Sequence, residues 1–162
     1  MSDVEGNLNH EMASSRAGAG RLLTPDEAGA GAEAEGTTQL PPFGVDELAA
    51  RARGYYTAVD SGDVDAVLAC FSEDAVYRRP GYEPIVGSAG LREFYGGVRV
   101  ISSGAHELDE VVVQGMSAAT RGVFTGRLRD GSDTRVGFAD FFGFDDAGRI
   151  RTRSTFFDAP AV

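Results

Sequence analysis

One stretch of the chain, Thr134–Phe144, sets a single carboxylate among aromatic side chains. It reads T-R-V-G-F-A-D-F-F-G-F, and in a β-strand its residues alternate between two faces. The even-numbered face carries Val136, Phe138, Asp140, Phe142 and Phe144. An ionised Asp in such surroundings is costly unless it is paired. Asp140 is therefore a candidate general base or neutral hydrogen-bond donor, and the alternative is a structural Asp bonded to a neighbouring strand or an Arg.

Other side chains are candidates for the same cavity. In the register assumed for the neighbouring strands, the residues predicted to line it and bind substrate are Arg79, Arg121, Val123, Phe138, Phe142, Arg153 and Phe157. The guanidinium groups could pair with Asp140 or bind a carboxylate or enolate oxygen of a ligand. The alternative for each Arg is an exposed position at a strand end. His106, predicted at the rim, is a candidate catalytic residue because imidazole exchanges protons near neutral pH.

Helical periodicity comes first in the chain, and strand alternation follows it. Helices are predicted from Val45 to the Ser61-Gly62 stop, from an Asp63 N-cap to Phe71, and from Gly87-Ser88 to Gly96-Gly97. Strands are predicted at Asp74–Arg79, Ala105–Gln114, Ala118–Leu128, Thr134–Phe144 and Arg149–Phe157. This order indicates an α+β fold, in which three helices close the concave side of a curved, mostly antiparallel sheet. Such an arrangement encloses a ligand-sized cavity.

The composition excludes several functions. The formal net charge of −10 argues against nucleic acid or an anionic membrane as a partner. All 15 basic residues are Arg, so neither Schiff-base chemistry nor a P-loop lysine is available. With one cysteine and two histidines, we expect no disulfide, no metal centre and no cofactor. No apolar run has the length of a membrane span and no signal peptide is evident, so a cytoplasmic location is expected.

The chain divides at its Pro-Pro pair. Residues 1–42 are rich in Gly, Ala, Ser and Glu and poor in bulky apolar side chains, which predicts a disordered acidic tail. Residues 43–162 are long enough to form one folded domain with its own core.

Three motifs resemble a known superfamily. They are Y-Y-T-A-V-D-S-G-D-V-D-A-V-L-A-C-F-S-E-D-A-V-Y (Tyr55–Tyr77), G-S-A-G-L-R-E-F-Y (Gly87–Tyr95) and F-A-D-F-F-G-F-D-D-A-G-R-I (Phe138–Ile150). Together they are similar to ketosteroid isomerase and the SnoaL-like polyketide cyclases, which belong to the nuclear transport factor 2-like superfamily of cone-shaped α+β domains. The resemblance covers residues 45–160, and it leaves the function open because this fold hosts many activities.

The resemblance implies roles for particular residues. Asp140 falls where ketosteroid isomerases hold a protonated oxyanion-hole donor, and where SnoaL-like cyclases have a proposed base for aldol ring closure. Tyr55 falls near a tyrosine that supports the isomerase oxyanion network. The isomerase's general-base Asp precedes a proline, but here Arg79 precedes Pro80. An Arg cannot accept a proton at neutral pH, so steroid-type isomerisation with the usual base is not expected.

These features predict a cofactor-independent cyclase or isomerase of polyketide-type secondary metabolism, as in antibiotic biosynthesis. Asp140, Tyr55 and His106 are its candidate catalytic residues, and the ring closure could be of pericyclic type. An epoxide hydrolase or epoxide-opening cyclase is one alternative, and a non-catalytic binding protein for a hydrophobic small molecule is another. The opposite face of the sheet, with Phe141 and Phe156, is predicted to pack against a second copy in a homodimer.

Overall fold

The computed structural model describes residues 41–159, so the predicted tail lies outside the described residues except for Pro41 and Pro42. The elements are, in order, α1 (Val45–Ser61), α2 (Val64–Ala69), β1 (Phe71–Arg78), β2 (Ile85–Val86), α3 (Gly87–Glu93), the π-helical turn η1 (Phe94–Val98), β3 (Ile101–Gln114), β4 (Ser117–Leu128), β5 (Asp133–Phe144) and β6 (Ile150–Phe157). Long strands therefore follow the helices, as the periodicity predicts.

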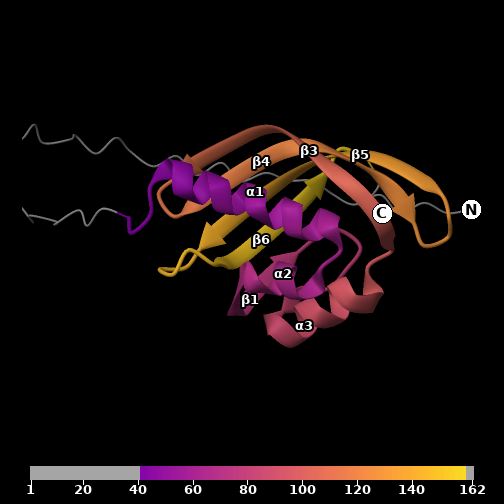
Figure 1. Ribbon diagram of the computed structural model, residues 1–162, viewed down its shortest axis with the longest axis horizontal. Helices are drawn as coiled ribbons and strands as arrows, with labels where there is room; N and C mark the ends of the chain where they lie inside the picture. The colour runs from indigo at the N-terminus through magenta and orange to yellow at the C-terminus, as the bar shows by residue number, and fades with distance from the viewer. Residues whose placement is uncertain (1–40, 160–162) are drawn as a thin grey trace, which may run out of the picture. The chain divides into compact units, whose positions relative to one another are not determined.

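The strands form one mixed sheet with the order β2-β1-β6-β5-β4-β3 in the described part of the chain. All neighbouring strands are antiparallel except β1 and β6, which are parallel. Figure 1 shows α1 lying across one face of the curved sheet, with α2 and α3 beside β1. Helix α1 packs on β3 and β4, and α3 packs on β1. The fold is α+β, and the helices on this face leave room for a site over β5 and β6.

The ends of α1 and α2 follow from their sequences. The buried face of α1 consists of Leu48, Ala52, Tyr55, Tyr56 and Val59, which recur at helical spacing. The helix ends at Gly62, whose φ of 75° is favourable for glycine, and the Gly62 N–H donates to the Val59 carbonyl at 3.2 Å. The predicted N-cap of α2 is confirmed, because the Asp63 carboxylate accepts from the Ala66 N–H at 3.0 Å.

The register of β4 corrects one prediction. Thr120 lies opposite Asp140 in the β4–β5 ladder, so even-numbered residues of both strands share the helix-covered face. The prediction that Arg121 and Val123 face the cavity is wrong, since both lie on the other side of the sheet. Arg121 has a side chain 67% exposed and a weak ion pair with Glu110 at 3.8 Å. Apolar residues occur on both faces of β4, so alternation alone did not fix its direction.

The other two predicted faces agree with the structure. Phe138, Asp140 and Phe142 of β5 lie on the helix-covered side with Arg153 of β6, and all four are buried. On the opposite side, Phe141 and Phe156 are 54% and 55% exposed, and their rings meet edge to face with centroids 5.9 Å apart. Within residues 41–159, no helix is long and apolar enough to cross a membrane.

Candidate functional site

Asp140 lies at the centre of a buried polar network. It is fully buried and forms a bidentate ion pair with Arg153, with Nε at 3.1 Å from Oδ1 and Nη2 at 2.8 Å from Oδ2. The hydroxyl of Tyr56 donates to Oδ2 at 2.6 Å, and that of Thr155 donates to Oδ1. A third hydroxyl, from Thr120, lies 2.5 Å from the Tyr56 oxygen. Four donors from helix α1 and strand β6 therefore converge on one carboxylate.

This arrangement gives Asp140 a counter-ion and a full set of hydrogen-bond donors. A carboxylate has about four lone-pair sites, and four donors occupy them here. Burial raises the pKa of Tyr56, and the neighbouring Asp140 carboxylate raises it further, so this hydroxyl keeps the proton that it donates. Asp140 is therefore not the isolated carboxyl group that the apolar β5 pattern suggested. It is the partner of Arg153, which was the structural alternative.

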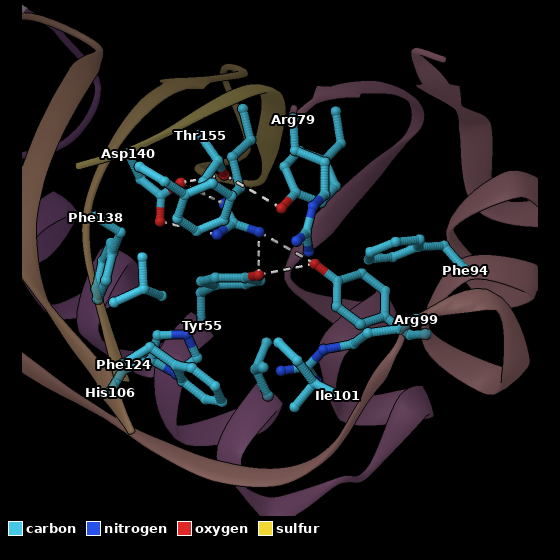
Figure 2. Close-up of a pocket in the computed structure, with 16 residues that line it drawn as sticks. Tyr55, Arg79, Phe94, Arg99, Ile101, His106, Phe124, Phe138, Asp140 and Thr155 are labelled. Carbon is cyan, nitrogen blue, oxygen red and sulfur yellow. Dashed lines mark hydrogen bonds and ion pairs between the residues drawn. The ribbon is translucent and has the colours of Figure 1, made fainter. Parts of the chain in front are cut away.

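Arg153 also donates hydrogen bonds to two tyrosines that line a cavity. Its Nη1 donates to the hydroxyl of Tyr55 and to that of Tyr95, the latter at 3.2 Å, and the two hydroxyls lie 2.7 Å apart (Figure 2). Burial raises the pKa of Tyr95 to about 12 and that of Tyr55 well above its usual range, although Arg153 acts in the opposite direction on both. Both tyrosines are thus neutral near pH 7. One of the two hydroxyl protons forms the hydrogen bond between Tyr55 and Tyr95, so the other hydroxyl proton is available to a ligand.

A second acid-centred pair lies at the end of α1. The Nδ1 atom of His106, on β3, is 2.5 Å from Oδ1 of Asp60, and the His106 backbone N–H donates to Oδ2 at 2.9 Å. A carboxylate only accepts, so Nδ1 carries the proton and Nε2 is the basic nitrogen. The imidazole packs against the rings of Tyr56, Phe124 and Phe138, which fix its orientation. Among residues 41–159, no hydrogen bond occupies Nε2.

The tyrosine pair and the His106–Asp60 pair meet at one cavity. The sequence-predicted residues that line it are Tyr55, Arg79, His106, Phe138, Asp140, Arg153 and Phe157. Figure 2 shows His106 and Phe124 on one side and Arg79 and Phe94 on another, with Tyr55 between them. The cavity has a volume of about 30 Å³, which holds only a few water molecules. A larger ligand would enter only if lining side chains move.

Two predicted residues need a separate description. Phe142 does not line the cavity and instead packs against the rings of Tyr55 and Tyr56. Arg79 is buried at one end, where its guanidinium lies 5.1 Å, 5.5 Å and 5.3 Å from the ring centroids of Tyr82, Phe94 and Phe157. These cation–π contacts place Arg79 in the cavity wall.

Sequence reasoning missed Asp60, Tyr56, Tyr95 and Arg99. Asp60 lies one helical turn after Tyr56 on the same face of α1, and that spacing was the available signal. Tyr95 lies in η1 and Arg99 directly follows it, beside a Gly96-Gly97 pair that was interpreted only as a helix end. Among the described residues, no group of three or more His, Cys, Asp and Glu side chains is placed to hold a metal ion.

Three solved structures share this fold. SalBIII, an epoxide hydrolase/cyclase-like enzyme with a role in pyran ring formation in the polyether salinomycin, is 21% identical with a TM-score of 0.62, over 69% of this chain and 91% of SalBIII. A ketosteroid isomerase-like protein from Erwinia carotovora atroseptica is 26% identical with a TM-score of 0.59, over 72% of this chain and 97% of that one. A protein described as a SnoaL-like polyketide cyclase, from Shewanella denitrificans, is 14% identical with a TM-score of 0.61, over 68% of this chain and 90% of its own.

The sequence itself matches a family. The model of the SnoaL-like domain family aligns with residues 52–152, which is more than half of the chain and runs from the middle of α1 to the start of β6, so that Arg153 lies just outside the match. The match covers Asp60, His106 and Asp140. The chain is therefore a member of the SnoaL-like family, within the nuclear transport factor 2-like superfamily.

Proposed function

We propose that this protein is a cofactor-independent enzyme that closes a ring, or isomerises a double bond, in a hydrophobic polyketide-type metabolite. One observation carries the proposal. A histidine oriented by a carboxylate and two hydroxyls polarised by a buried guanidinium line the same small aromatic cavity. A base opposite a hydrogen-bond donor is the arrangement needed to form and stabilise an enolate.

His106 is the proposed general base and acid. Its Nε2 takes the proton from a carbon next to a carbonyl group. The electron pair of that C–H bond forms a carbon–carbon double bond, and the π pair of the carbonyl group moves onto its oxygen. The hydroxyl of Tyr95 donates to this oxygen, with Tyr55 and Arg153 behind it. The enolate carbon then attacks a second carbonyl carbon of the same substrate, and the resulting alkoxide takes the proton back from His106. In an isomerisation, the proton returns to a different carbon.

Asp140 has a positioning role in this mechanism. It holds the guanidinium of Arg153 in one plane through two hydrogen bonds, and Arg153 in turn holds the tyrosine pair. Asp60 does the same for His106, because its bond to Nδ1 fixes the tautomer that leaves Nε2 basic. The two carboxylates thus support the two halves of the site.

The test uses ketones that report enolate formation directly. We expect the purified full chain to speed deuterium incorporation next to the carbonyl of 1-tetralone or 2-tetralone in heavy water, measured by proton NMR. His106→Gln should lower this rate by roughly 10²–10⁴, the usual contribution of general acid–base catalysis, without lowering the melting temperature. The matched control is His10→Gln, which changes the other histidine of the chain and should leave the rate unchanged.

The same experiment separates the alternatives. If the site opens epoxides instead, styrene oxide will be hydrolysed in a His106-dependent way while the tetralones exchange no faster than in buffer. If the protein only binds a hydrophobic molecule, neither substrate will react and both will still bind. A full rate in His106→Gln would show that another group removes the proton.

A further inference from the structure

The guanidinium of Arg99 lines the cavity and is not used by the mechanism above. Arg99 follows η1 and lines the cavity together with Tyr95 and Ile101. Its side chain is partly buried and reaches from the η1 ribbon toward the cavity (Figure 2). It is close enough to Tyr95 for its charge to lower the pKa of that hydroxyl, against the larger effect of burial.

The backbone of Arg99 is fixed on both sides. Its N–H donates to the Phe94 carbonyl at 2.9 Å, and its own carbonyl accepts from Nε of Arg129 at 2.9 Å. The point at which the side chain leaves the main chain is therefore fixed beside the cavity.

Arg99 differs from most other arginines in how its charge is balanced. The arginines that form ion pairs with a carboxylate are Arg51, Arg92, Arg121, Arg127, Arg149, Arg151 and Arg153. Within residues 41–159, no carboxylate forms an ion pair with Arg99, although the chain as a whole has a net charge of −10. The only carboxylate that lines the described cavity is Asp140, and Arg153 and two hydroxyls already occupy it.

We infer that Arg99 binds a carboxylate group of the ligand, so that the substrate class is an aromatic or polyketide-derived acid rather than a neutral molecule. A guanidinium with a free donor edge matches the two oxygens of a carboxylate. Once lining side chains move to admit the ligand, the aromatic rings of Phe94, Phe124 and Phe138 would contact the apolar body of the same molecule. This inference rests on the proposed function only in assigning the ligand as a substrate.

Anchoring at Arg99 would also set the orientation of the ligand. Arg99 and Ile101 lie on one side of the cavity in Figure 2, and His106 and Phe124 lie on another. A molecule held by its carboxylate at Arg99 would extend its carbon skeleton across Tyr95 toward His106. The acid group would then select which carbon meets the base.

Binding of unreactive acids tests the inference without turnover. Benzoate, phenylacetate and 2-naphthoate, together with their methyl esters, are titrated into the full-length chain by calorimetry and NMR. We expect at least one acid to bind more than about tenfold tighter than its ester, because hydrogen bonds to charged groups contribute about 1.5–3 kcal/mol. Arg99→Gln should weaken the binding of that acid by roughly 10- to 100-fold and leave the binding of the ester unchanged.

Arg121→Gln is the matched control, since it makes the same substitution on the exposed side of β4 and should not change acid binding. The inference is overturned if no acid binds at millimolar concentration, if ester and acid bind equally, or if Arg99→Gln weakens both alike. Each of these results leaves the His106 experiment untouched. Conversely, selective acid binding by a His106→Gln variant would support the inference even if His106 proved unnecessary for proton removal.

Discussion

Strand β5 carries phenylalanine side chains on both faces, but those on one face are buried and the one on the other face is exposed to solvent. On the helix-covered face, Phe138 and Phe142 surround Asp140, which is fully buried and completely hydrogen-bonded. On the other face, Phe141 is 54% exposed next to an equally exposed Phe156. Charge is therefore buried where donors from α1 and β6 converge, and apolar surface is exposed where no element of the described chain covers it.

The two faces of the sheet differ in what they need for the domain to fold. A buried carboxylate is tolerated only with its counter-ion and hydroxyl donors in place, so the inner face depends on the correct docking of α1 and β6. The outer face needs no partner within the domain to fold, but its aromatic pair gains from leaving water. We propose that a second copy of the chain covers this face in a two-fold homodimer.

The largest expected effect comes from breaking the inner network. Asp140→Asn leaves the buried guanidinium of Arg153 without its counter-charge, and we expect the free energy of unfolding to fall by about 3–5 kcal/mol. Urea denaturation of the full chain measures this loss. Asp74→Asn is the control, because its ion pair with Arg151 at 3.5 Å is exposed and should contribute less than about 1 kcal/mol.

An alternative result for Asp140→Asn would change its assignment. If the variant unfolds at the same urea concentration as the parent but loses turnover, the carboxylate itself takes part in the chemistry, and its positioning role is wrong. If stability and activity fall together, the result supports a positioning role for Asp140 and leaves proton transfer to His106.

The next effect concerns the outer face and is a change of oligomeric state. Phe141→Arg or Phe156→Arg places a charge in the proposed dimer interface, and we expect monomers in light scattering with little loss of domain stability. Val45→Arg introduces the same charge at another exposed position, on α1, and should leave the dimer intact. A monomeric parent protein would show that the face has a different role.

The smallest effect is a dependence of stability on alkaline pH. A tyrosine in the unfolded chain ionises near pH 10.0, but burial raises the pKa of Tyr95 to about 12 in the folded protein. The native state therefore holds a proton that the unfolded state has lost, and the associated stability is present below pH 10 and is lost as the pH rises toward 12. Denaturation across this range, compared between the parent and Tyr95→Phe, measures it. Tyrosine absorbance that titrates in a single step near pH 10 would contradict it.

Much of this arrangement was predictable from local sequence, and some was not. The alternation in β5 placed Asp140 and Phe138 correctly, because one side of that strand is continuously apolar. The facing direction of Arg121 was not predictable, since it depends on the exact length of the β4–β5 turn. Asp60 and His106 are paired through the docking of α1 on β3, and no spacing in the sequence reports a contact between residues so far apart.

The position of β6 has a consequence for how the protein folds. This last strand inserts between β1 and β5, so the sheet becomes continuous only when Ile150–Phe157 pairs with a strand from the first half of the domain. Contacts of such large sequence separation form slowly, because the closure of the intervening chain costs entropy before it is repaid. Until that step, Asp140 has no Arg153 beside it. During synthesis, the cavity is therefore completed only after Phe157 has left the ribosome.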